Sequence, residues 1–195
     1  GGVLEIIGIG TQEKYYFAST TTIDEISLAK AIKVILESKD ITLVSYNIKE
    51  LYTWCLCHDT EIQCQLFDLM VAEYLIDSLA SSYSIPDLSR KYLGIEVEMP
   101  KEGKGKGKQI ELEENEDNSI ELLGKAIPTF KIIYEKQKVI IDESKQNNLF
   151  YNVELPLSLV LGSMEYYGFR VDKQYIEEYG ERLDYRIKSL EQTIY

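Results

Sequence analysis

Basic residues are scarce in this sequence relative to acidic ones. Its 195 residues include 21 Lys and Arg against 33 Asp and Glu, which gives a formal net charge of −12. Proteins that bind nucleic acid gain most of their affinity by neutralising phosphates with Lys and Arg. The composition therefore excludes a general polyanion binder. Any nucleic-acid role has to come from a local site, from bound metal or from a larger protein.

Long apolar runs are missing too. No stretch approaches the roughly 20 apolar residues that a membrane-spanning helix needs. The first residues, GGVLE, lack the basic start of a signal peptide. We therefore expect no contact with a membrane and a cytoplasmic protein. The abrupt ends of the chain suggest a piece of something larger.

Cysteine and histidine are few. Cys55, Cys57 and Cys64 are close together and odd in number, so we expect reduced thiols rather than a disulfide framework. With His58, the single histidine, they leave open a zinc-binding module, because Cys and His are preferred zinc ligands. Against zinc, two thiols at this spacing on one helix point about 200° apart. His58 has no Ser or Cys partner that the sequence places beside it as a catalytic triad.

The first half of the sequence alternates between strand and helix patterns. Short β-prone runs at residues 3–9 and 14–18 predict a hairpin. Thr22 followed by Glu25 is a capping box, which predicts a helix to about residue 37. The next patterns predict a strand, a helix capped by Asn47, a buried apolar helix and a short helix, at residues 41–46, 47–57, 67–76 and 86–93. This order predicts an α/β fold.

Residues 95–118 break the pattern. Lysines alternate with glycines and a run of acids follows, so the segment buries little apolar area and we expect a mobile loop. DNA contact by the lysines is an alternative, which the neighbouring acids disfavour because they neutralise the basic charge. The lysines concerned are Lys101, Lys104, Lys106 and Lys108.

Helical periodicity returns at Ser119. Pro128 is expected to kink or divide that helix. A further helix is predicted at residues 149–167, ended by Gly168, and Asp172 then caps a long amphipathic helix. The tyrosines at helical spacing are interpreted as packing residues rather than base-stacking platforms; among them are Tyr74, Tyr134, Tyr175 and Tyr179.

Three stretches resemble one family. Residues 155–172 (LPLSLVLGSMEYYGFRVD) resemble the pattern PLxxVLAxMExxGVxVD at the start of the polymerase domain of bacterial A-family DNA polymerases (DNA polymerase I). Residues 67–94 are similar to FDTMLAAYLL and SSYDIADLAKKYLG of their 3′–5′ exonuclease domain, and residues 43–49 (LVSYNIK) resemble their VGHNLKYD strand–helix junction more weakly.

The resemblance implies an α/β fold of the RNase H-like exonuclease type, a mixed sheet with flanking helices, followed by long helices. It implies an exonuclease-like domain at residues 1–148, with the mobile loop at about 95–118. It also implies that residues 149–195 are the N-terminal helices of the polymerase domain, at the base of the thumb.

The resemblance also implies where a nuclease site would lie. The reaction needs two divalent metals held by oxygen ligands. The family supplies these ligands from an Asp-x-Glu on its first strand, from an Asp four residues after the Asn of the junction, and from a Tyr-x-x-x-Asp on a later helix. Asn47 matches the junction, but Leu51 stands at the Asp position, and Lys125 and Thr129 replace the later Tyr and Asp.

The Asp-x-Glu strand is missing as well. Residues 3–18 match the second and third strands of the family better than the first, and it stays open whether residues 3–9 fill the place of the first strand. The expectation is a vestigial exonuclease with no catalytic residue and no metal. The alternative is an active metal-dependent exonuclease that uses displaced carboxylates, for example Glu5, Glu50 and Asp68.

By resemblance, the longer protein is a DNA-directed DNA polymerase of DNA replication and repair that uses Mg²⁺ and deoxynucleotides. Its polymerase carboxylates lie outside these residues, so no cofactor is expected in this chain. The expected partners are DNA, through the full-length polymerase, and the rest of the polymerase chain, which this domain braces. Arg182, Arg186 and Lys188 are candidate contacts to the DNA backbone.

Overall fold

The computed structural model describes residues 5–11, 13–100 and 112–194. It confirms the predicted hairpin, in which β1 (Ile6–Gly10) pairs antiparallel with β2 (Tyr15–Ser19). Gly8 and Gly10 let helix α5 approach β1 closely, because a Cβ at Gly8 would lie 2.2 Å from Ile127 Cδ1.

A parallel strand pair follows the hairpin. After α1 (Glu25–Leu36), β3 (Thr42–Ser45) pairs in parallel with β4 (Gln65–Asp68), and α2 (Ile48–Cys57) lies in the connection between them. Among the described residues the two pairs are separate two-stranded sheets, β1–β2 and β3–β4.

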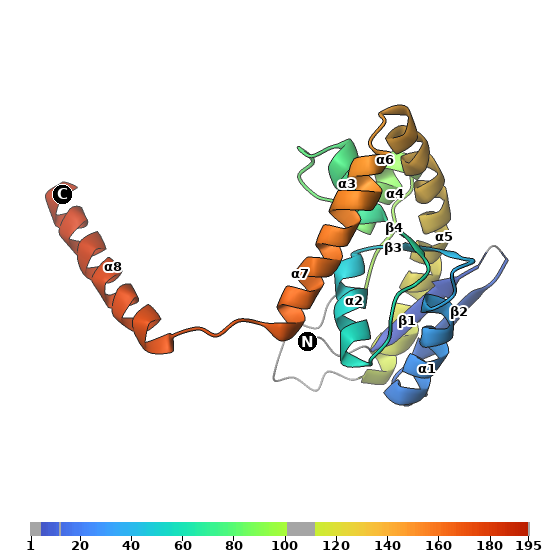
Figure 1. Cartoon of the computed structure of the whole chain (residues 1–195), viewed down its shortest axis with the longest axis horizontal. Helices are drawn as coiled ribbons and strands as arrows, with labels where there is room; N and C mark the ends of the chain where they lie inside the picture. Colours follow the sequence, from blue (N-terminus) through green and yellow to red (C-terminus); the bar gives the residue numbers. More distant parts are fainter. Residues whose placement is uncertain (1–4, 12, 101–111, 195) are drawn as a thin grey trace.

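The rest of the chain is helical (Figure 1). The elements are α3 (Leu69–Ile76), α4 (Ile85–Leu93), α5 (Leu112–Glu143), α6 (Asn147–Leu149), the π-helical segment η1 (Phe150–Glu154), α7 (Leu155–Tyr167) and α8 (Lys173–Ile194). α5 packs against α3, α4 and strands of both sheets, whereas α7 packs along α2. α8 extends away from this body as an arm. The architecture is the mixed α/β fold with long following helices that the sequence predicts.

Two apolar clusters hold the body together. The larger one joins α3, α4, α5 and η1 around the buried rings of Phe67 and Phe150, whose centroids are 4.8 Å apart. The smaller one packs α1 against α2 and contains Leu36, Cys55 and Cys64. Burial of each large apolar side chain contributes about 1.5–3 kcal/mol, so these clusters dominate the folding energy.

The predicted helix at residues 67–76 is wrong at its start. Phe67 and Asp68 belong to strand β4, and α3 begins only at Leu69. Pairing with β3 satisfies the backbone groups of this short run, which the apolar pattern alone does not distinguish from a buried helix.

The predicted caps of α1 and α2 are wrong in detail. Asp24, not Thr22, caps α1, and its carboxylate accepts a hydrogen bond from the Ser27 N–H at 3.0 Å. Asn47 does precede α2, but its backbone is left-handed (φ 58°) and its side chain makes no capping bond.

The predicted loop at residues 95–118 is too long at its end, because α5 begins at Leu112. Residues 101–111, with the four lysines considered above, lie outside the described residues. Pro128 lies inside α5 without dividing it. Packing of α5 against α3, α4 and the strands explains why tertiary contacts override the local preference.

The packing interpretation of the tyrosines is wrong for part of the set. Tyr134 does pack in the core, with its ring 4.7 Å from that of Phe67. Tyr74, Tyr175 and Tyr179 are exposed large side chains. Within α8, which is described in full, no residue is buried.

Candidate functional site at the Asn47 junction

The site that the sequence indicates lies where two parallel strands end. β3 and β4 are in register with Ser45 opposite Asp68, and the chain leaves β3 through Asn47 into α2. Carboxyl ends of parallel strands are the usual place for ligand-binding residues in α/β folds. The junction therefore brings together Ser45, Asn47, Glu50 and Asp68.

Asp68 is the central charged group of this junction. Its side chain is fully buried, and its Oδ2 accepts a hydrogen bond from the Ile48 N–H at 2.5 Å, while its Oδ1 accepts one from the Val71 N–H at 2.9 Å. Ser45 Oγ donates to the same carboxylate at 3.4 Å. Asp68 thus caps the N-termini of both α2 and α3.

Burial raises the pKa of the Asp68 carboxyl above its ordinary value. The hydrogen bonds from Val71 and Ile48 act in the opposite direction, but burial is the larger cause. A carboxylate that is buried and already accepts these bonds is poorly suited to hold a solvent-accessible divalent metal.

Asn47 contacts the Glu50 side chain in the first turn of α2 rather than a backbone N–H of that helix. Its Nδ2 donates a hydrogen bond to Glu50 Oε1. Its Oδ1 is buried and has no hydrogen-bond partner among the described residues. Glu50 itself is exposed. The displaced carboxylates Glu50 and Asp68 therefore both approach the junction, but in different environments.

Non-carboxylate side chains occupy the positions where the family has metal ligands. Leu51 packs against both apolar clusters. Thr129 is buried on α5, where its hydroxyl donates to the Ala126 carbonyl at 2.6 Å and lies 3.5 Å from Ser89 Oγ. Lys125 points to solvent and pairs with Glu121 at 2.5 Å. None of these three side chains offers a carboxylate oxygen.

β1 carries no acidic residue that could take the place of the family's Asp-x-Glu. β1 pairs only with β2, and the hairpin is not joined to β3–β4. Glu5 is exposed just before β1, and its backbone carbonyl accepts a hydrogen bond from the Thr20 N–H. Within the described ranges, no group of three or more His, Cys, Asp or Glu side chains is placed to hold a metal ion. The donor set at the junction therefore does not fit a two-metal centre.

The cysteine and histidine cluster divides between core and surface. Cys55 and Cys64 are buried, and burial raises the pKa of the Cys55 thiol to about 12, whereas Cys57 is exposed. His58 instead contacts Glu25, with Nε2 3.3 Å from the carboxylate, and its ring lies 4.3 Å from that of Trp54.

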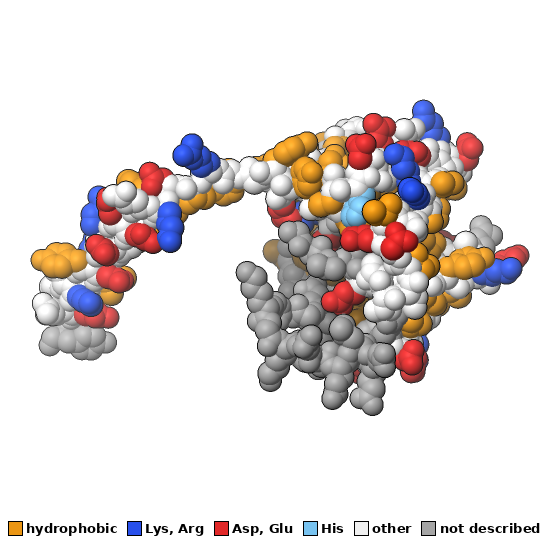
Figure 2. Space-filling view, turned by 90° about the horizontal axis from the view of Figure 1, so that it is seen from below, with side chains coloured by type: hydrophobic (Ala, Val, Ile, Leu, Met, Phe, Trp, Pro, Cys, Tyr) orange, Lys and Arg blue, Asp and Glu red, His pale blue; other side chains and the backbone are white. Residues whose placement is uncertain are grey.

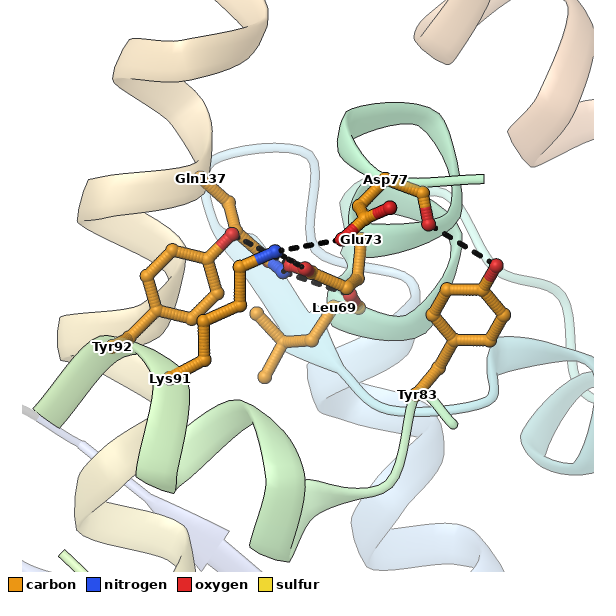
Figure 3. A network of polar contacts seen from close by, with 7 residues as sticks. All are labelled: Leu69, Glu73, Asp77, Tyr83, Lys91, Tyr92 and Gln137. Carbon is orange, nitrogen blue, oxygen red and sulfur yellow. Dashed lines mark hydrogen bonds and ion pairs between the residues drawn. The ribbon is translucent and has the colours of Figure 1, made fainter. Parts of the chain in front are cut away.

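The sequence patterns did not predict a buried polar network that joins α3, α4 and α5 (Figure 3). Glu73 is buried and accepts hydrogen bonds from Lys91 Nζ and from the Tyr92 hydroxyl, each at 2.6 Å, and from Gln137 Nε2 at 2.8 Å. Gln137 Nε2 also donates to the Leu69 carbonyl. The one available signal was Glu73 itself, an acid in an apolar helix.

The candidate DNA contacts lie on the arm. Arg182 is placed over the rings of Tyr175 and Tyr179, with its Cζ 5.9 and 5.5 Å from their centroids. These two rings are parallel to within 10°. Arg182, Arg186 and Lys188 are all exposed on α8. Their contact with DNA stays a prediction.

α7 meets the body at α2 through a glycine. A Cβ at Gly162 would lie 3.1 Å from Tyr52 Cδ1 and 3.2 Å from the Lys49 carbonyl oxygen. Next to this crossing, Lys49 Nζ pairs with Glu165 at 2.7 Å, and the Thr53 hydroxyl lies 3.4 Å from the Gly162 carbonyl oxygen. A side chain at position 162 requires the neighbouring atoms to shift by a few tenths of an ångström, so glycine favours this close approach of the two helices.

Comparisons with known proteins point in one direction. The family model of the DNA polymerase I ribonuclease H-like domain matches residues 3–132. The chain is 30% identical over 164 residues to a DNA polymerase I of Caldicellulosiruptor bescii. The matched segment covers 84% of this chain and 17% of that protein. It is 29% identical over 135 residues to a DNA polymerase I of Bacillus subtilis, and this match covers 69% of this chain and 15% of that protein.

Among solved structures, the fold is similar to the POL domain of Pol1 from M. smegmatis in complex with a DNA primer-template and dNTP. The TM-score is 0.62 at 17% identity, and the match covers 97% of this chain and 33% of that one. The chain thus spans about a sixth of the curated relatives and a third of this structure. No helix in the described part of the chain is long and apolar enough to cross a membrane.

Proposed function

The chain belongs to the DNA polymerase I family through its ribonuclease H-like domain, and from that premise we propose that it is part of a cytoplasmic DNA-directed DNA polymerase of DNA replication and repair. In this proposal residues 1–148 form an exonuclease-like domain without nuclease activity. Residues 149–195 begin the polymerase domain, which the first domain braces. The longer protein binds DNA and uses Mg²⁺ and deoxynucleotides through residues outside this chain.

The environment of Leu51 carries the proposal that the nuclease is inactive. Leu51 stands where the family pattern has a metal-binding carboxylate, and its side chain belongs to both apolar clusters instead. A divalent metal of a nuclease needs several oxygen ligands. Thr129 adds support, because this buried side chain offers no carboxylate oxygen and its hydroxyl is bonded to a backbone carbonyl.

A nuclease assay tests this part directly. The purified chain is incubated at high concentration with 5′-labelled single-stranded DNA and Mn²⁺, and the products are resolved on a denaturing gel. The expected result is full-length DNA at every time point. A ladder that is lost in Glu50→Gln supports the alternative of displaced carboxylates, which the shared approach of Glu50 and Asp68 to the junction favours. A ladder that survives in Glu50→Gln but is lost in Asp68→Asn supports the same alternative through Asp68, and a ladder that survives in both variants indicates a contaminating nuclease.

The crossing of α2 and α7 supports the bracing role. α7 begins the segment that resembles the polymerase domain, and it is fixed to the exonuclease-like body by the close approach at Gly162 and by the Lys49–Glu165 ion pair. Tight helix packing of this kind resists sliding and rotation, because a bulky side chain at the crossing forces the neighbouring atoms to shift.

Substitution of Gly162 tests the bracing role. Gly162→Val is expected to destabilise the chain by about 1–3 kcal/mol and to speed amide exchange in α2 and α7. Gly180→Val is the matched control: it places the same residue in helix α8, where a Cβ meets nothing within 4 Å. Hydrogen exchange by mass spectrometry reports both. Equal effects of the two variants, with no local change at α2 and α7, contradict a braced α7.

A further inference from the structure

The spacing of buried residues changes at η1, along the helical stretch that runs from α6 into α7. Phe150 and Leu155 are both buried in the larger apolar cluster, although they are five residues apart. After them, burial continues at Leu159, which is partly buried, and at Gly162, at spacings of four and three residues. Spacings of three and four keep residues on one side of an α-helix, whereas residues five apart lie about 140° apart. An uninterrupted α-helix therefore does not place Phe150 and Leu155 on the same side.

The π-helical turn at η1 removes this mismatch. Its hydrogen bond runs from the Leu155 N–H to the Phe150 carbonyl, across five residues instead of the four of an α-helix. The turn thus holds one additional residue, and Phe150 and Leu155 come to lie roughly one above the other. Counted along a regular α-helix, Phe150 and Gly162 would lie about 120° apart. With one residue taken up by the π turn, they lie only about 20° apart.

Pro156 contributes to this turn but does not explain it alone. A proline inside a helix lacks the N–H that would bond to the carbonyl four residues back, here that of Asn152, and its ring crowds that oxygen. A wider turn gives the ring more room. Pro128, however, lies inside α5, which stays α-helical around it. The burial of both Phe150 and Leu155 is therefore the second requirement that selects a π turn at η1.

We propose that η1 is a rotational adapter, in which one additional residue turns α7 so that Gly162 meets α2 while Phe150 stays in the core. The inference deepens the proposed bracing role and rests on it. The upstream anchor is the ring of Phe150, 4.8 Å from that of Phe67. The downstream anchor is the crossing at Gly162, where a Cβ would lie 3.1 Å from Tyr52 Cδ1. Figure 1 shows α7 running from α6 along α2, so one continuous helical stretch carries both anchors.

Two matched deletions in the intact 195-residue chain test the adapter. Both carry Pro156→Ala, so that the helix regains the missing N–H. Deletion of Val153 removes the additional residue, and the hydrogen bond of the turn then spans four residues, as in an α-helix. Deletion of Val160 removes a comparably exposed valine from α7 itself, ahead of the crossing, and turns Gly162 about 100° away from α2.

Amide exchange in α2, followed by mass spectrometry, and the midpoint of thermal unfolding compare each deletion with Pro156→Ala alone. Deletion of Val153 is expected to leave both unchanged. Deletion of Val160 is expected to speed exchange in α2 about tenfold or more and to lower the midpoint, because Ser163 then takes the place of Gly162 at the crossing. Global unfolding of the Val160 deletion alone counts as the same result.

Loss of protection in α2 on deletion of Val153, or failure of that variant to fold, overturns the inference whatever the deletion of Val160 does. Unchanged exchange in both deletions overturns it as well, and Gly162→Val then separates the two proposals. If Gly162→Val speeds exchange in α2, the bracing role stands although η1 does not set the rotation of α7. If it has no such effect, the bracing role fails too.

Discussion

Asp68 holds the N-termini of two helices with one carboxylate, and this explains why a buried acid remains at the junction. Its two oxygens accept hydrogen bonds from the backbone N–H groups of Ile48 and Val71, which lie in the first turns of α2 and α3. Leu51 and Thr129, by contrast, are integrated into the core as an apolar side chain and as a hydroxyl bonded to the backbone. The junction is thus held together by helix capping and by core packing.

The pH dependence of stability tests the state of Asp68. Because burial raises its pKa, the folded chain binds this proton more tightly than the unfolded chain. The stability of wild type relative to Asp68→Asn is therefore greatest below the ordinary pKa of 3.8, and it falls as the pH rises through that value toward the raised pKa. Urea unfolding from about pH 3.5 to 7 measures the difference.

Asp24→Asn is the control for this measurement, since Asp24 also caps a helix. The hydrogen bond from Ser27 lowers the pKa of Asp24, so wild type gains stability relative to Asp24→Asn as the pH rises through 3.8. The two aspartates are thus expected to give opposite slopes. Two rising slopes indicate that the N–H bonds at Asp68 outweigh its burial, contrary to this account.

At the scale of elements, α3, α4 and α5 are joined by polar contacts as well as apolar packing. Glu73 on α3 accepts hydrogen bonds from Lys91 and Tyr92 on α4 and from Gln137 on α5, so one buried carboxylate connects three helices. Removing one partner of a buried charge leaves the other without compensation, which costs more than losing a surface pair.

Lys91→Met tests this connection. The lysine side chain is 43% exposed, so the expected loss is reduced by solvent screening to about 1–3 kcal/mol of unfolding free energy. The matched control is Lys125→Met, which removes an exposed pair with Glu121 and is expected to change stability by less than about 0.5 kcal/mol. Thermal and urea unfolding measure both. Equal losses contradict a role for Glu73 as a connecting group.

Much of the element order was predictable, because the hairpin, α1, β3, α2, α4 and α8 all carry local signals such as Pro86, Gly94 and Asp172. The exact caps of α1 and α2 were not. β4 was not predictable, since its four residues run directly into the apolar helix α3. The start of α5 was not predictable, because its first turns are rich in acidic residues and resemble a solvated loop. Pro128 suggested a break in α5 that tertiary packing overrides. The Glu73 network depends on three helices meeting in space, which no local pattern records.

At the scale of the whole molecule, charge opposes DNA binding by this chain alone. The net charge of −12 makes the average surface repel phosphates, although Arg182, Arg186 and Lys188 give α8 local basic groups. Figure 2 shows acidic and basic side chains side by side along the arm. The DNA binding that we propose for the longer protein is therefore expected to rely mainly on parts outside this chain.

Fluorescence anisotropy with labelled single-stranded and duplex DNA checks this expectation. At about 150 mM salt we expect a dissociation constant weaker than about 1 µM, because few phosphates are neutralised. Arg182→Gln with Arg186→Gln is expected to weaken the residual binding further at low salt. Sub-micromolar affinity at physiological salt is incompatible with this charge argument.

A titration of the intact chain with Mn²⁺, followed by electron paramagnetic resonance, measures whether the junction holds a two-metal centre. The expected result is the signal of free Mn²⁺ up to about millimolar metal, with no difference between wild type and Glu50→Gln. Binding of a coupled pair of Mn²⁺ ions at micromolar concentration in wild type, lost in Glu50→Gln, would contradict the proposal that the junction binds no metal pair.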